Sequence, residues 1–250
     1  MSISPYESGS PDHTESDGVD NDANPIARIV EPRTLALHVV KDRKLVHYDQ
    51  AARRQADAFR EIRTRLLSLG GGKNFVTLVA PVSPRCGGSF VSCNLAAAFA
   101  FHDAKNAVLV DCDLGHPSQH DNLNVDPVGG GLAEYLEHRH ASLDKVIYRT
   151  RIPQLGLIPV GSGHNFSAEH FSSARMREML SQLISEDPSR YVVHDAPAVN
   201  ASPDARILSE LADFVVLVAG SGRDTAEDIR KAASNFGSDK FAGVVFNQLP

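Results

Sequence analysis

The chain contains little of what would place it outside the cell or in a membrane. Its 250 residues include no tryptophan and three cysteines, at positions 86, 93 and 112. An odd number of cysteines without zinc-type spacing argues against a disulfide framework and favours reduced thiols. No apolar run approaches the ~18 residues of a transmembrane helix, and no N-terminal stretch has the basic start and apolar centre of a signal peptide. We therefore expect a cytoplasmic protein.

Positive charge is also scarce. Lys and Arg number 25 against 31 Asp and Glu, which gives a net charge of −6, whereas nucleic-acid binding needs a basic surface. No nucleic-acid partner is therefore expected. The first 25 residues contain six acidic residues and no Lys or Arg, and such a composition cannot bury enough apolar surface to offset its ordering entropy. We predict a disordered or extended segment over residues 1–48 and one domain over residues 49–250.

Apolar runs alternate with amphipathic stretches along the rest of the chain. The apolar runs are continuous, which is typical of strands buried on both faces, and they cover residues 75–80, 107–111, 155–159, 191–195, 213–218 and 241–246. Helices are expected at about 48–69, 89–102, 170–186, 203–211 and 224–236. This order predicts an α/β fold, doubly wound, with a mostly parallel sheet and helices on both faces.

A glycine-rich turn follows the first apolar run and opens a helix. Gly87, Gly88 and Ser89 stand where a phosphate-binding loop carries Gly-Lys-Ser. In such a loop the backbone N–H groups and the helix N-terminus hold phosphate, the lysine reaches the outer phosphates, and the hydroxyl holds Mg²⁺. The cradle is thus present without its cation, and Arg85 is the available substitute. A tight strand-to-helix connection with a solvent-facing arginine is the alternative.

Three carboxylates, Asp111, Asp113 and Asp195, follow two of the expected strands. Because the carboxyl ends of parallel strands meet at one edge of a sheet, where ligands bind, we expect these side chains beside the glycine-rich turn. Carboxylate oxygens together with nucleotide phosphates are the ligands that Mg²⁺ prefers, so Ser89, Asp113 and Asp195 form a candidate magnesium site. Vestigial polar residues that cap the following turns are the alternative.

Five segments in this order and spacing resemble the cytoplasmic ATPase-like domain of the bacterial tyrosine kinases, a family related to the MinD/ParA group. They are the helical stretch 57–63, the glycine-rich turn 80–96, the aspartate segment 108–117, the Walker B-like segment 191–199 and the last strand 241–247. The resemblance covers roughly residues 50–250. It implies a P-loop NTPase-like fold, with ATP or ADP and Mg²⁺ as cofactors and with Asn247 at the adenine.

The resemblance also implies roles for other residues and a partner. Asp111 and Asp113 would take part in catalysis. Asp57, Arg60 and Arg63 share one helix face at three-residue spacing and would form the subunit contact of a homo-oligomer; on a generic helix they would be a solvated surface. Members of the family act with a membrane polysaccharide co-polymerase in capsule and exopolysaccharide export. That partner implies a peripheral location at the inner membrane.

The departures from the family pattern affect residues that, in the family, bind nucleotide or take part in catalysis. Gly88 replaces the lysine, Phe90 replaces a small hydroxyl residue, and Gly115 replaces an arginine of the aspartate segment. Because lysine gives phosphate a charge-assisted contact, its loss is expected to weaken or abolish the binding of ATP or ADP. Restoring the loop with Gly88→Lys and Phe90→Thr is expected to raise nucleotide affinity, since the rest of the loop persists.

These features favour a catalytically impaired relative of the bacterial tyrosine kinases that regulates exopolysaccharide or capsular polysaccharide biosynthesis and export. The first alternative is an active ATP-binding protein tyrosine kinase or ATPase with an atypical P-loop. Its tyrosine substrate would have to lie elsewhere, because the five tyrosines of the chain are not clustered. The second alternative is a MinD/ParA-like positioning ATPase, although Ser83 stands where that group carries its signature lysine.

Overall fold

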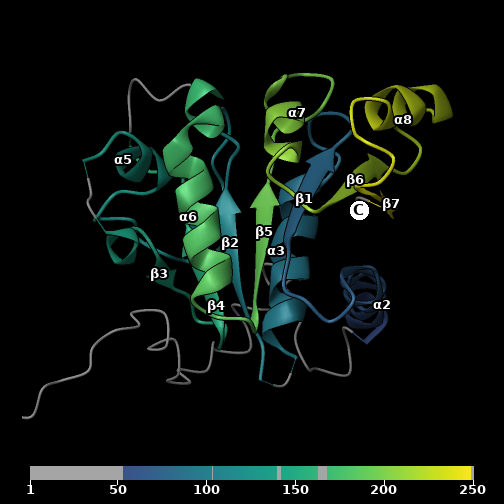
Figure 1. Cartoon of the computed structure of the whole chain (residues 1–250). Helices are drawn as coiled ribbons and strands as arrows, with labels where there is room; N and C mark the ends of the chain where they lie inside the picture. Colours follow the sequence, from purple (N-terminus) through teal and green to yellow (C-terminus); the bar gives the residue numbers. More distant parts are fainter. Residues whose placement is uncertain (1–52, 103, 140–141, 163–167, 249–250) are drawn as a thin grey trace, which may run out of the picture.

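The structure is a computed structural model that describes residues 53–102, 104–139, 142–162 and 168–248 (Figure 1). The segment predicted over residues 1–48 therefore lies outside the described residues. In the described part, no helix has both the length and the apolar character needed to cross a bilayer.

A single sheet of seven strands forms the centre of the domain. Its strands are β1 (Val76–Pro81), β2 (Asn106–Asp111), β3 (Tyr148–Arg149), β4 (Leu155–Ile158), β5 (Arg190–Asp195), β6 (Phe214–Gly220) and β7 (Phe241–Asn247). Their order is β3-β4-β2-β5-β1-β6-β7, and every neighbouring pair is parallel except β3 with β4. The predicted mostly parallel sheet is confirmed. Only β3 was not predicted, because two residues at a sheet edge carry no periodicity.

Helices connect the strands. They are α2 (Arg53–Gly70), α3 (Gly88–Ala100), α4 (Gln119–Leu123), α5 (Leu132–Leu136), α6 (Ala174–Ser185), α7 (Asp204–Ser209) and α8 (Ala226–Ala233), with short 3₁₀ turns η3 (Leu143–Lys145) and η4 (Ala168–Ser172). The helix expected over residues 170–186 is divided at Ser173. The hydroxyl of this residue accepts a hydrogen bond from the Met176 N–H at 3.1 Å and so begins α6 as an N-cap.

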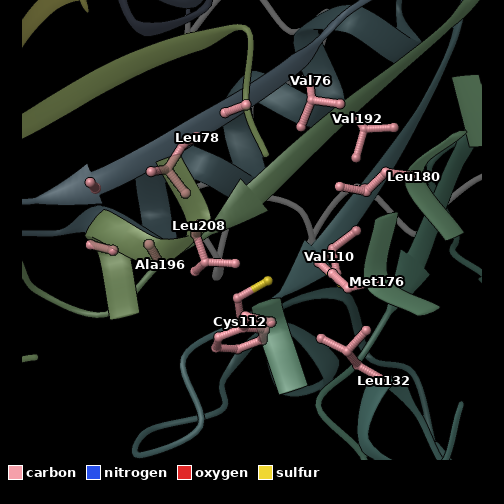
Figure 2. Packing of buried hydrophobic residues seen from close by; sticks show 14 of the residues in the cluster. Val76, Leu78, Val110, Cys112, Leu132, Met176, Leu180, Val192, Ala196 and Leu208 are labelled. Carbon is pink, nitrogen blue, oxygen red and sulfur yellow. The ribbon is translucent and has the colours of Figure 1, made fainter. Parts of the chain in front are cut away.

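Two hydrophobic clusters fill the two faces of the sheet. In one, Leu78 and Val110 of the strands pack with Met176 of α6 and Leu208 of α7 (Figure 2). The other joins the opposite face to α3 and α2. Neighbouring strand residues belong to different clusters, because successive side chains of a strand point to opposite faces. The sheet is therefore covered on both sides, as a doubly wound fold requires.

Helix α3 lies against the sheet and carries the glycine-rich turn at its N-terminus. Of its thirteen residues, eleven are buried, with the sheet on one side and α2 packed alongside (Figure 1). Five of these residues are alanine or glycine, and small side chains allow close approach of the helix on both sides. This packing fixes the end of α3 beside the carboxyl ends of β1, β5 and β2.

Candidate functional site

The predicted site residues meet at the carboxyl edge of the sheet. Strand β5 lies between β2 and β1, so that Asp111 of β2 and Val79 of β1 are both register partners of Asp195. A pocket of about 620 Å³ opens at this edge. Its lining includes the predicted Arg85, Gly87, Gly88, Ser89 and Asp113, together with Pro81 and Phe90. The structure thus brings the glycine-rich turn and the aspartate segment together around one cavity.

The backbone of the turn has the geometry of an anion cradle. Arg85 has a φ of 62° and Gly87 a φ of 92°, so both residues are in the left-handed region and the chain bends sharply into α3. Within the part of the chain that the structure describes, no acceptor is bonded to the backbone N–H of Gly88 or Ser89. Free N–H groups at a helix N-terminus attract phosphate. The cradle therefore fits phosphate groups.

The lysine position is closed by the last residue of β1. A Cβ atom placed on Gly88 would lie 2.5 Å from Pro81 Cγ and 3.0 Å from Pro81 Cβ and Cδ. Because the pyrrolidine ring is rigid, it cannot move aside as the end of a long side chain could. Adding a lysine at position 88 therefore requires a change at Pro81 as well, which the sequence-based expectation for Gly88→Lys did not include.

The other substitution in that expectation, Phe90→Thr, would remove a packing contact. Phe90 is the third residue of α3, and its ring packs edge-on against Phe59 of α2, with ring centroids 5.9 Å apart. Phe59 is buried in the cluster between α2 and the sheet. Replacing Phe90 by threonine would remove this aromatic contact, so Phe90 serves the packing of α2 in addition to lining the pocket.

Asp111 accepts hydrogen bonds from three backbone N–H groups and lies out of contact with solvent. Its Oδ2 accepts from Ser118 and Gln119 at 3.0 Å each, and its Oδ1 accepts from Asp113 at 3.3 Å. Burial raises the pKa of its carboxyl group to about 6, against the lowering effect of these hydrogen bonds. These hydrogen bonds connect the aspartate segment to the start of α4. They agree with the alternative interpretation, in which Asp111 caps the turn that follows it.

Asp113 forms part of the pocket wall. Its Oδ1 accepts the backbone N–H groups of Gly115 at 3.2 Å and His116 at 3.1 Å, which closes an Asx turn. His116 Nδ1 lies 3.8 Å from the same oxygen. Unlike Asp111, Asp113 lines the cavity and so remains available to a ligand there.

Asp195 is buried with one oxygen unbonded. Its Oδ2 accepts a hydrogen bond from Gln119 Nε2 at 2.5 Å, whereas no described group is hydrogen-bonded to its Oδ1. Burial raises the pKa of this carboxyl group to about 7, with a further contribution from the charge of Asp111, against the lowering effect of the Gln119 hydrogen bond and of the nearby Ser92 and Ser89 hydroxyls. A buried carboxylate oxygen without a partner is rare and indicates a place for a cation or a proton.

Gln119 is a site residue that the sequence analysis missed. It is fully buried at the start of α4, where its Nε2 also donates to Ser89 O at 3.0 Å and Ser92 Oγ at 3.2 Å. None of the recognised segments includes it. Its sole local signal is the preceding Pro-Ser pair, which is typical of a helix start.

The oxygen atoms at this edge fit a divalent cation by their chemistry. Mg²⁺ binds carboxylates, hydroxyls and phosphate oxygens, and the site offers Ser89, Asp113 and Asp195. The unbonded Asp195 Oδ1 is the observation that supports this fit. The same residues were predicted as metal ligands, and their role in metal binding stays a prediction.

The outer side of the glycine-rich turn is held by the end of β7 and by the loop between β6 and α8. Asn247 Nδ2 donates to Cys86 O at 3.0 Å, Arg223 Nη1 donates to Arg85 O at 3.2 Å, and the Ser83 hydroxyl donates to Asp224. Asn247 is not part of the pocket lining. It contacts the turn itself in this structure, and its predicted contact with adenine is untested.

The three residues predicted for subunit contact have different environments on α2. Arg60 Nη1 pairs with Asp57 Oδ1 at 2.7 Å on the exposed surface. Arg63 instead donates from Nη1 to Ala98 O of α3 at 2.9 Å. The last carbonyl groups of a helix lack partners within it, so Arg63 caps α3 inside its own chain. Only Asp57 and Arg60 present their charged groups as a solvated or partner-binding surface.

Comparison with known proteins identifies the relatives of the chain. No protein-family model matches it. It is 32% identical over 197 residues to the putative tyrosine-protein kinase EpsB of Ralstonia solanacearum, and the match covers 77% of this chain and 26% of that protein. It is 24% identical over 200 residues to the tyrosine-protein kinase CpsD of Streptococcus agalactiae, covering 79% of this chain and 84% of that protein. The chain thus spans about a quarter of the length of EpsB.

Solved structures give the same assignment. The BceF tyrosine kinase domain matches with a TM-score of 0.67 at 27% identity, over 78% of each chain. The kinase domain of the Escherichia coli tyrosine kinase ETK matches with a TM-score of 0.68 at 25% identity, over 78% of this chain and 75% of that one. A ParA family ATPase from Chlorobium tepidum shares the fold, with a TM-score of 0.54 at 18% identity over 70% of this chain and 74% of that one. The chain is therefore a homologue of the bacterial tyrosine-protein kinases, and its described part has the P-loop NTPase fold of their kinase domains.

Proposed function

We propose that the chain regulates the biosynthesis and export of capsular polysaccharide or exopolysaccharide and is impaired in phosphoryl transfer. The observation that carries this proposal is the contact between Pro81 and the position of the missing lysine. Phosphoryl transfer depends on cations that neutralise charge on the transferred group. A loop that cannot hold a lysine at position 88 lacks one of these cations, so that nucleotide binding would be weak and turnover slow or absent.

Such a site would bind nucleotide mainly through its backbone. The free N–H groups of Gly88 and Ser89 would hold phosphate oxygens, and Arg85 at the pocket rim would add positive charge. A magnesium ion, when bound, would neutralise phosphate charge; the Ser89 hydroxyl and the carboxylates of Asp113 and Asp195 would hold it. Asp111 is already bonded to three N–H groups, so that of the two carboxylates of the aspartate segment Asp113 is the one that lines the pocket.

The proposed partner is a membrane polysaccharide co-polymerase of the chain-length-determinant type. The reason is the homology to kinases of the EpsB and CpsD kind together with the family resemblance of the sequence. The chain would then act in the cytoplasm at the inner membrane through that partner, as a monomer or as a homo-oligomer. The net charge of −6 supports no role for nucleic acid.

Titration and turnover measurements test the proposal directly. A fluorescent ADP or ATP analogue is titrated into the full chain with and without Mg²⁺, and phosphate release is measured beside the isosteric variant Asp195→Asn. We expect weak binding and no release above that of the variant. In the bacterium that encodes the chain, deletion should impair polysaccharide export and the Asp195→Asn variant should restore it. Turnover that disappears in the variant, together with failed restoration, would show an enzyme instead.

A second candidate function is an active protein tyrosine kinase or ATPase with an atypical P-loop. The unbonded Asp195 Oδ1 beside a free anion cradle favours it, because both features would suit Mg²⁺ and phosphate. A positioning ATPase of the MinD/ParA kind has support from the fold alone, and fold does not determine function. The hydroxyl of Ser83, at the signature-lysine position of that group, is bonded to Asp224.

A further inference from the structure

We propose that the side-chain amide of Gln119 takes the place of a divalent cation between α3 and Asp195, and that this amide must leave before such a cation can bind. Gln119 Nε2 is 2.5 Å from Asp195 Oδ2, 3.0 Å from Ser89 O and 3.2 Å from Ser92 Oγ. One donor atom thus lies among three oxygen atoms. The inference concerns the cation site of the proposed function. It rests on the proposed function only for the idea that a divalent cation binds there.

The orientation of the amide follows from its neighbours. A side-chain amide can present either its nitrogen or its oxygen, and the choice is assigned from the hydrogen-bond network. Here the surrounding atoms are a carboxylate oxygen, a backbone carbonyl oxygen and a hydroxyl oxygen. When Asp195 is ionised, the amide oxygen in this position would face two acceptors that cannot donate. The nitrogen therefore faces Asp195, and its N–H groups provide the positive charge density that a metal ion would provide.

The position of Gln119 is fixed from its backbone as well. Its own N–H donates to Asp111 Oδ2 at 3.0 Å, and its Oε1 accepts from Asn122 Nδ2 at 3.4 Å. The residue therefore contacts both buried carboxylates of the site, one through its backbone and one through its side chain. A neutral donor held this firmly satisfies Oδ2 of Asp195 without any ion, while Oδ1 stays unbonded.

Two changes at position 119 separate this role from simple packing. Gln119→Met keeps the size of the side chain and removes its N–H groups, so Asp195 would lose its donor and a cation could replace it. Gln119→Glu places a further carboxylate beside Asp195 and Ser89 O, which favours a cation more strongly. Gln182→Glu on the exposed face of α6 makes the same chemical change away from the site and is the matched control.

The experiment uses Mn²⁺ alone with the full chain, without nucleotide or partner. Bound Mn²⁺ is measured by loss of the free-ion electron paramagnetic resonance signal, and thermal unfolding is followed with and without the ion. We expect the Kd for Mn²⁺ to be at least ~10-fold lower in Gln119→Glu than in the wild type and in Gln182→Glu. Mn²⁺ should also raise the melting temperature of Gln119→Met more than that of the wild type.

Equal Mn²⁺ affinity in the wild type and Gln119→Glu, or a Gln119→Met variant that is destabilised without rescue by Mn²⁺, would overturn the proposal. The second result would leave Gln119 as a packing residue. Because this experiment contains no nucleotide, neither result tests the proposed function. That function is tested separately by the titration with a nucleotide analogue. Conversely, failure of nucleotide to bind the wild type would not alter the Mn²⁺ comparison.

Discussion

The ring of Pro81 occupies the space in which a side chain at Gly88 would begin, with Pro81 Cγ 2.5 Å from the place of a Cβ atom. Pro81 ends β1 and Gly88 begins α3, so the two residues meet where the chain returns across the carboxyl edge of the sheet. The glycine at the position of the P-loop lysine therefore leaves room for the ring of Pro81, the residue that precedes the loop. We expect substitutions at Pro81 and Gly88 to have energetically coupled effects on stability.

Stability should report this coupling. Gly88→Ala is expected to destabilise the fold by ~1–3 kcal/mol through overpacking against Pro81, which outweighs the helix propensity that alanine gains. Pro81→Ala should recover most of the loss in the double variant, as a double-mutant cycle in urea would measure. Gly115→Ala is the control, because its Cβ would meet only Asp113 Oδ1 at 3.6 Å. Additive effects of the two changes would contradict the steric account.

Restoring nucleotide affinity should require changes at both Gly88 and Pro81. We expect Gly88→Lys in the Pro81→Ala background to bind a fluorescent ADP analogue about tenfold more tightly than Pro81→Ala alone, which corresponds to ~1.4 kcal/mol. Gly88→Lys by itself should give no gain, because its side chain meets the Pro81 ring. Phe90 is left unchanged in this design because of its contact with Phe59. A full gain from the single substitution would show that the ring moves aside.

The pH dependence of stability should depend on Asp195. Its folded-state pKa of about 7 lies above the ordinary value of 3.8, so between these values the folded state binds more protons than the unfolded state. The stability that this group contributes is present at low pH and is lost as the pH rises through about 7. Relative to the wild type, Asp195→Asn should therefore gain at least ~1 kcal/mol between about pH 4 and pH 8.

Urea unfolding of both proteins at several pH values measures this difference. Other buried groups titrate in the same interval, including Asp111, with a pKa raised by burial to about 6, and His194, with a pKa lowered by burial to about 4. The effect of His194 is present in both proteins and largely cancels in the comparison, whereas the titration of Asp111 changes with the substitution, because the charges of Asp111 and Asp195 interact. Parallel stability curves for the two proteins would show that Asp195 is ionised in the fold throughout.

Arg60 and Arg63 of α2 should differ in their contributions to stability. Arg63→Ala is expected to cost ~1.5–3 kcal/mol, because the carbonyl group of Ala98 loses a charged donor. Arg60→Ala should cost less than ~1 kcal/mol, since its pair with Asp57 is exposed. Urea midpoints measure both.

If α2 forms the subunit contact, Arg60→Glu should weaken self-association in sedimentation experiments without loss of stability, whereas unchanged association would mark a solvated surface.

The sequence by itself determined the layered architecture and the edge at which the site lies. Continuous apolar runs such as residues 107–111 and 213–218 can be accommodated only where both faces of a strand are buried, and their alternation with helices makes the strands parallel. From this it followed that Asp111 and Asp195 end up together. The missing lysine was equally visible, because a P-loop is a local pattern of glycine, lysine and hydroxyl residues.

Tertiary structure alone decided which of those residues are free to act. Gln119 and Asp195 are 76 positions apart, and Arg63 lies 35 positions from the Ala98 carbonyl group that it caps. Neither pairing leaves a periodic or compositional signal. Such contacts depend on the packing of α3 against the sheet and of α2 against α3, which fixes distances to fractions of an ångström. For the same reason, the ring of Pro81 closes the lysine position only when β1 and α3 are both in place.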